Sequence, residues 1–291
     1  PIGSPPLKSS ADSRAMLHRD PLRPITETEV SAYQRDGAVL LRGLFDLDWI
    51  EALCQAVDDD KAKPGEMVRY NTPPGNAGEF FVDFQLWQRW EPARRFALEG
   101  PGGAIAARMM EAETIAYYHD HLLVKEPGTQ EITPWHHDQP YYPIEGRMVG
   151  SIWLPLDPVP RDICVEFIAG SHCWDRWFAP QFFRSGTPDL QTQDPRFETI
   201  PDFESQRHEL DLLSWDLDLG DCIFFHALVV HGAPGNASLQ TRRRAYATRW
   251  LGEDTRYATR PGQTSPPLEG HGLEPGDPMT CEMFPQVWSR I

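Results

Sequence analysis

Two histidine-rich segments hold the residue types that ligate a metal. The first reads TPWHHDQP over 133–140, and the second reads GDCIFFHALVVHG over 220–232. Because residues two apart share one face of a strand, His136 and Asp138 are expected to reach the same point, while His137 faces away. Together with one imidazole from the second segment they would form a 2-His-1-carboxylate face. Such a face leaves open positions on an octahedral metal and suits non-haem Fe(II).

The second segment offers two candidates for the remaining imidazole. His226 and His231 are five residues apart, so in a regular strand they would point to opposite faces. Spacing alone leaves open which of them is the ligand.

The elements that must position these residues change in character along the chain. Thr26-x-x-Glu29 has the form of a capping box and predicts a short helix that ends near Gly37. The other elements expected before residue 117 are an extended arm over 1–23, a strand over 38–43, a second helix capped by Asp46 and a third helical stretch over roughly 91–116. The part from 24 to 116 is therefore expected to be mainly helical.

From about residue 117 the chain alternates short β-branched and aromatic segments with turns. These segments are HLLVKEP, MVGSIWLPLD, CVEFIAG, HELDLLSW, DCIFFHALVV and RAYATRWLG. Many short strands without intervening helical periods indicate a barrel or sandwich. We expect one domain over 24–291, with a β jelly-roll core over 117–251, an insertion over 172–208 above the barrel mouth and a tail over 252–291 that wraps the surface.

Four of these segments and the start of the chain resemble one known family. WHHDQPYY, IAGSH (168–172), the GDCIFFH…HGAPGN block and RRRAYATRW occur in the order and spacing typical of the phytanoyl-CoA dioxygenase (PhyH) family. The resemblance runs from about Thr26 to Trp250 and includes the opening TETEVSAYQRDGAVLLRGLFD. It implies a mainly β protein with N-terminal helices and a double-stranded β-helix, which is a jelly-roll or cupin-like fold. It also implies an Fe(II)- and 2-oxoglutarate-dependent dioxygenase that uses O2.

The resemblance also assigns roles to residues. It implies that His136, Asp138 and His231 bind iron, because the family's distal ligand stands at a His-Gly-Ala/Ser position. The distal carboxylate of 2-oxoglutarate needs a fixed cation, and a guanidinium supplies two parallel donors matched to it. The usual family spacing selects Arg242, whereas an alignment on the following Arg-Ala pair selects Arg243. Strand parity favours Arg243, because it shares a face with two alanines that leave space for a cofactor.

Further residues match cofactor or substrate contacts less closely. Those matched to 2-oxoglutarate are Lys125, His121, Trp153 and Thr133, and those expected near the substrate are Tyr141, Tyr142, Trp174 and Arg249. Halogenases of this superfamily have a small residue where Asp138 stands, so we expect hydroxylation or desaturation of a small organic substrate. The alternatives are a catalytically silent metal-binding β-barrel module and a cupin-type metal-dependent isomerase or hydrolase.

Composition restricts the partners. The 291 residues carry a formal net charge of −16, which argues against binding to a phosphate backbone and favours a small-molecule partner. No apolar run approaches a membrane span, and the start lacks a signal-peptide pattern. Five cysteines that are far apart and form no CxxC pair fit a reducing cytoplasm. The sequence leaves the oligomeric state open.

Overall fold

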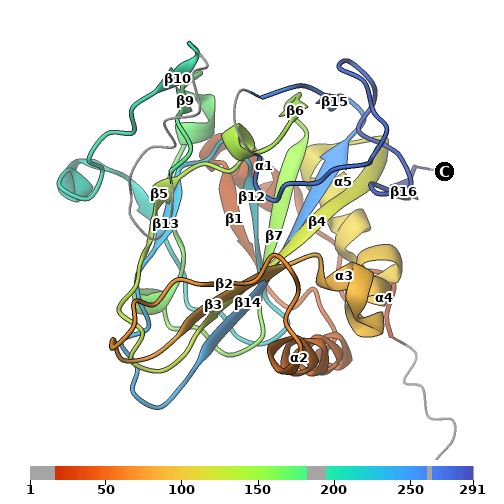
Figure 1. The fold of residues 1–291 in the computed structure, drawn as a ribbon. Helices are drawn as coiled ribbons and strands as arrows, with labels where there is room; N and C mark the ends of the chain where they lie inside the picture. The colour runs from red at the N-terminus through yellow and green to blue at the C-terminus, as the bar shows by residue number, and fades with distance from the viewer. Residues whose placement is uncertain (1–16, 182–194, 261–263, 291) are drawn as a thin grey trace, which may run out of the picture.

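Two antiparallel sheets form the core of the chain (Figure 1). A computed structural model describes residues 17–181, 195–260 and 264–290. The large sheet has the strand order β1-β12-β7-β14-β4-β3-β2, with β16 added on β4, and the small sheet has the order β11-β8-β13-β5. This is the jelly-roll arrangement that the alternation of strands and turns predicted.

The strands of the large sheet are β1 (Ala38–Leu41), β2 (Arg69–Tyr70), β3 (Phe80–Phe84), β4 (Thr114–Lys125), β7 (Val149–Pro155), β12 (Cys222–His226), β14 (Arg243–Gly252) and β16 (Gln286–Ser289). Those of the small sheet are β5 (Thr133–His136), β8 (Glu166–Ile168), β11 (Leu212–Leu213) and β13 (His231–Ala233). Two short pairs complete the set: β6 (Ile144–Glu145) with β15 (Arg256–Tyr257), and β9 (Trp177–Phe178) with β10 (Phe197–Glu198).

The helices pack on the outer face of the large sheet. They are α1 (Glu27–Asp36), α2 (Leu47–Ala62), α3 (Leu86–Arg89), α4 (Glu91–Glu99) and α5 (Gly102–Met110). The largest apolar cluster joins their buried side chains to Tyr246 and Trp250 of β14, which point away from the small sheet. The helical layer thus supports β14 from behind and leaves the opposite face of that strand for the site.

The predicted helix starts are confirmed at residue level. Thr26 accepts a hydrogen bond from the Glu29 amide, and the Glu29 carboxylate accepts one from the Thr26 amide, which completes the capping box of α1. Gly37 ends the helix with φ 81°, a conformation that favours glycine. Asp46 caps α2 through the amide of Asp48.

The expected helical stretch over 91–116 is wrong in its extent. It divides at Gly100 and Pro101 into α4 and α5, and strand β4 already begins at Thr114. The part before residue 117 also contributes β2 and β3 to the large sheet. These strands were missed because β2 has only two residues, whereas every residue of β3 is buried and so shows no alternation of polar and apolar residues.

The ends of the chain and the insertion are described only in part. Residues 1–16 of the expected arm and 182–194 of the expected insertion lie outside the described residues. Of the tail, β15 pairs with β6, and β16 pairs with the start of β4 (Figure 1). In the part of the chain that the structure describes, no helix has the length and apolar character to cross a membrane.

Candidate active site

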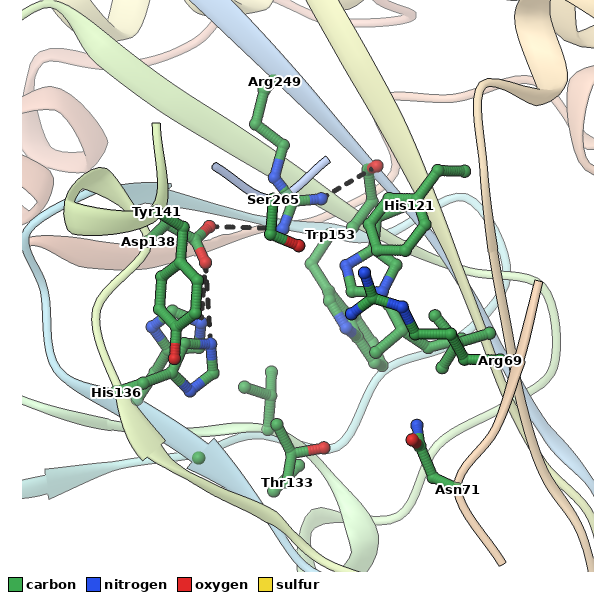
Figure 2. Close-up of a pocket in the computed structure, with 18 of the residues that line it drawn as sticks. Arg69, Asn71, His121, Thr133, His136, Asp138, Tyr141, Trp153, Arg249 and Ser265 are labelled. Atoms are coloured by element: carbon green, nitrogen blue, oxygen red, sulfur yellow. Dashed lines mark hydrogen bonds and ion pairs between the residues drawn. The ribbon is translucent and has the colours of Figure 1, made fainter. Parts of the chain in front are cut away.

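Three predicted metal ligands meet between the two sheets. β13 pairs with β5 so that His231 stands opposite His136, and Asp138 lies two residues beyond the end of β5. The Nε2 atoms of His136 and His231 lie 3.6 and 3.7 Å from Oδ1 of Asp138. Figure 2 shows His136 and Asp138 directed toward one point at one side of the cavity. One ligand atom from each of the three residues lies within 4.8 Å of the others, close enough to share one ion.

The route by which Asp138 reaches this point differs from the expectation. Strand β5 ends at His136, and Asp138 has a helical backbone, with φ −73° and ψ −40°, at the start of a short 3-10 helix over Gln139–Tyr141. A turn, and not strand alternation, therefore brings the carboxylate beside the imidazole. His137 faces away as predicted, and its Nε2 accepts a hydrogen bond from the amide of Phe178.

Backbone carbonyls orient both imidazoles. Nδ1 of His136 lies 2.7 Å from the carbonyl oxygen of Pro134, and Nδ1 of His231 lies 3.0 Å from that of Val229. If each Nδ1–H donates to its carbonyl, the Nε2 lone pairs face the common point, which is the usual arrangement of a metal-binding histidine. Burial, together with neighbouring His136, lowers the pKa of His231 to about 3, so its ring is neutral at neutral pH.

Arg249 holds the carboxylate of Asp138. Its Nη2 lies 3.2 Å from Oδ2 of Asp138, and its Nε donates to the Tyr142 hydroxyl at 3.0 Å. Burial alone would raise the pKa of Asp138, but the charge of Arg249 and the two imidazoles more than offset it and hold that pKa well below its ordinary value. Asp138 is therefore an anion that turns Oδ1 to the imidazoles. This donor set of two imidazoles and one carboxylate fits Fe(II).

His226 lies outside this cluster. It ends β12 in the large sheet, whereas His231 begins β13 in the small sheet. Nδ1 of His226 accepts a hydrogen bond from the amide of Leu228, and its ring packs 5.3 Å from that of His172. The two histidines point to different places because the chain turns between them. They do not lie on opposite faces of one regular strand.

A cavity of about 500 Å³ opens beside the three ligands. Its charged and aromatic lining residues include Arg69, Phe84, His119, His121, His136, Asp138, Tyr141, Tyr142, Trp153, Phe225, His231, Arg243 and Arg249. Both sheets contribute to this wall, and the strands of the large sheet present alternate residues to it (Figure 2).

The two candidate arginines have different surroundings. Arg243 lines the cavity and is only 2% exposed; it donates one hydrogen bond to the carbonyl of Ile163, while its Nε has no partner among the described residues. Burial lowers the pKa of Arg243 to about 10, which leaves the guanidinium charged at neutral pH. Arg242 does not line the cavity and forms a surface ion pair with Glu126, with its Nε 3.2 Å from the carboxylate.

The other predicted contacts divide into two groups. His121, Trp153 and Thr133 line the cavity, as do Tyr141, Tyr142 and Arg249. Within the described residues, Nε2 of His121 and Oγ1 of Thr133 are buried without a hydrogen-bond partner, as Arg243 Nε is. Such orphaned polar atoms around one cavity fit a polar diacid such as 2-oxoglutarate.

Lys125 and Trp174 do not reach the cavity. Nζ of Lys125 donates to the carbonyl of Pro234 at 2.8 Å and lies 4.5 Å from the centroid of the Phe80 ring. Trp174 packs on Phe203 in a separate apolar cluster. A direct contact of either side chain with a ligand in the cavity is therefore not supported by its position.

Sequence reasoning missed several residues of the cavity wall. They are chiefly Arg69, Asn71, Phe84 and His119. His119 could have been found by parity, since it precedes His121 by two residues on one strand. Arg69 and Asn71 could not, because β2 becomes a strand only by pairing with β3.

The comparisons with known proteins agree with this geometry. The family model described as phytanoyl-CoA dioxygenase (PhyH) matches residues 33–245, which is more than half of the chain. The chain belongs to the PhyH family. The predicted family and the predicted class of enzyme, a dioxygenase, are thereby confirmed. The predicted cofactors, iron and 2-oxoglutarate, agree with this family and with the donor set.

Among curated relatives, this PhyH chain is similar to the multifunctional dioxygenase prhA of Penicillium brasilianum, with 23% identity over 252 residues, 79% of this chain and 74% of that protein. It also matches the human peroxisomal phytanoyl-CoA dioxygenase, with 24% identity over 52% of this chain and 44% of that protein.

Two solved structures show the same fold. The non-haem alpha-ketoglutarate-dependent carbocyclase SnoK from nogalamycin biosynthesis has a TM-score of 0.69 and 22% identity, covering 91% of this chain and 97% of that chain. EctD from S. alaskensis, solved with 2-oxoglutarate and 5-hydroxyectoine, has a TM-score of 0.64 and 18% identity, covering 91% and 94%. The predicted fold class is thus confirmed for the PhyH chain.

Proposed function

We propose that this enzyme hydroxylates or desaturates a small organic substrate and decarboxylates 2-oxoglutarate to succinate and CO2. The observation that carries the proposal is the buried cluster of His136, Asp138 and His231, with Arg243, whose Nε has no partner among the described residues, on the wall of the same cavity. The volume of about 500 Å³ is within the range of pockets for small molecules.

The three metal ligands and two arginines have separate roles in the proposed reaction. His136, Asp138 and His231 would hold Fe(II), which with 2-oxoglutarate supplies the O2 activation for oxidation of a C–H bond. Arg243 binds the distal carboxylate of 2-oxoglutarate through two parallel donors. Arg249 positions the Asp138 carboxylate.

Three further residues complete the cofactor contacts. His121 and Thr133 offer hydrogen bonds to the carboxylates of 2-oxoglutarate from their orphaned atoms, and Trp153 packs against its carbon chain. The apolar remainder of the wall excludes water around the reacting atoms.

A visible spectrum tests this function directly. When Fe(II) and then 2-oxoglutarate are added anaerobically, we expect the weak metal-to-ligand charge-transfer band of the chelate to appear. If the folded, iron-loaded protein lacks the band, it is a silent metal-binding module or a cupin-type isomerase or hydrolase, and the proposed function is wrong.

Asp138→Gly should end hydroxylation. The change removes a ligand and its negative charge from the iron, so turnover of the prime substrate should fall to background. Gain of chlorination is not expected, because chloride also needs suitable polar groups around it. Product analysis in chloride buffer measures both outcomes. Hydroxylation at the wild-type rate would contradict the assignment of Asp138 as a ligand.

A further inference from the structure

A third arginine lies on the cavity face of the large sheet. Arg69 of β2 pairs with Val82 of β3, Val82 with Leu123 of β4, and Leu123 with Ala245 of β14. Residues in register across a sheet share a face, so Arg69 points to the same side as Ala245. Figure 2 shows its guanidinium reaching into the cavity from β2, across from His136 and Asp138.

Among the described residues, the Arg69 side chain has no carboxylate partner, unlike that of Arg249. Arg249 is paired with Asp138, and the proposed function uses Arg243 for 2-oxoglutarate. Arg69, in contrast, forms no ion pair or hydrogen bond through its side chain with any described residue. It is exposed at the mouth, so a ligand can reach it from solvent. A guanidinium on the cavity wall without a carboxylate partner among the described residues is available for an anionic ligand.

Two stacked rings, those of Phe84 and His121, lie beneath this guanidinium. Its Cζ lies 5.6 Å from the centroid of the Phe84 ring, and that ring stacks on His121 with centroids 4.2 Å apart and an interplanar angle of 15°. The cation–π contact holds the guanidinium over the ring without using its N–H groups, which remain for a ligand. Asn71, two residues farther along, adds an amide to the same wall.

The position of Arg69 separates it from the 2-oxoglutarate end of the cavity. β2 lies three strands from β14, which places the two backbones about 14 Å apart at ~4.8 Å per strand. Arg69 and Arg243 are therefore anchored at separate places along the large sheet. Val82 and Leu123, which stand in register between Arg69 and β14, add apolar side chains to the same wall.

We propose that Arg69 binds a carboxylate of the prime substrate, so that the substrate is an organic acid with an apolar body. This inference rests on the proposed function and names the substrate class of that site. The planar fork of a guanidinium matches a carboxylate, and the apolar side chains of Val82 and Leu123 on the same wall offer a surface for the carbon skeleton beside it. An acid anchored at Arg69 extends its apolar body toward the metal ligands, where a C–H bond is oxidised.

Matched acids and amides test the proposal. Anaerobic protein with Fe(II) and saturating 2-oxoglutarate is titrated with 3-phenylpropanoate, 4-phenylbutanoate and octanoate, and with their primary amides, by calorimetry and by the change in the visible band. Saturating 2-oxoglutarate keeps the probes from Arg243. We expect at least one acid to bind about tenfold or more tightly than its amide, the size of one charge-assisted contact. The preference should weaken with added salt, because Arg69 is exposed.

Variants assign the preference to this residue. Arg69→Gln should remove it, and Arg69→Lys should keep part of it. Arg94 is the matched control, an exposed arginine that stacks on Trp87 at 6.0 Å and does not line the cavity. Arg94→Gln should bind the acids like the wild type.

The outcomes are distinct. If the wild type shows the charge-transfer band but no acid is preferred, or if Arg69→Gln keeps the preference, the inference is wrong and the proposed function stands. If phenethyl phosphate binds better than every acid, the subsite takes phosphates and the assignment of a carboxylate is wrong. If the band itself is absent, the proposed function fails and this inference fails with it.

Discussion

Replacing His231 with alanine should abolish both iron retention and turnover while the protein stays folded. The change removes one of the three proposed protein ligands, and the backbone pairing of both sheets does not use the imidazole. Loss of even an outer partner of a metal ligand costs about 10–100-fold in affinity, so loss of the ligand itself should cost more. Iron content after desalting and the rate of succinate formation measure the effect, and circular dichroism checks the fold. His136→Ala should behave in the same way.

His226→Ala is the control for this prediction. Its imidazole is also buried but packs near His172, away from the cluster. The variant should therefore retain iron at the wild-type level, even where its stability falls. Wild-type activity in His231→Ala together with loss of iron in His226→Ala would show that the wrong histidine had been assigned.

Replacing Arg243 should weaken the binding of 2-oxoglutarate far more than that of the prime substrate. Truncation of one partner of a buried charge pair costs on the order of 2–5 kcal/mol. Arg243→Ala should therefore raise the KM for 2-oxoglutarate by roughly 30-fold or more. Arg243→Lys should be intermediate, because lysine keeps the charge and loses the two-donor fork. Titration of the charge-transfer band gives the same comparison without turnover.

Arg242→Lys tests whether Arg243 or the residue directly before β14 binds 2-oxoglutarate. Arg242 is paired with Glu126 at the surface, so its replacement should change the KM for 2-oxoglutarate only slightly. A large defect in Arg242→Lys beside a nearly normal Arg243→Lys would reverse the assignment.

Local pattern predicted the parts of the site that depend on regular structure. The alternation along β14 separated Arg243 from Arg244, and the structure places the first on the cavity and the second against Asp157. The same reasoning was misleading where the chain leaves a strand. Asp138 reaches the metal face from a turn, and the pair His226 and His231 is divided by another turn.

Sequence patterns could not predict that Arg69 lies on the cavity wall. A two-residue strand has no period, and its place in the sheet comes from pairing with β3, which is a tertiary contact. The capping box at Thr26 could be predicted because all its partners lie within four residues.

The proposed iron and 2-oxoglutarate contacts come from different sheets, and this affects the stability of the protein with both bound. His136 and His231 belong to the small sheet, whereas Arg243 belongs to the large one. A chelated diacid held by the iron at one end and by Arg243 at the other would act as a cross-link through the middle of the sandwich. A ligand that binds only the folded state stabilises it by about 2.7 kcal/mol at a hundredfold excess over its Kd. If Arg243 binds the distal carboxylate as proposed, we expect cofactor binding to stabilise the contact between the two sheets around the substrate cavity.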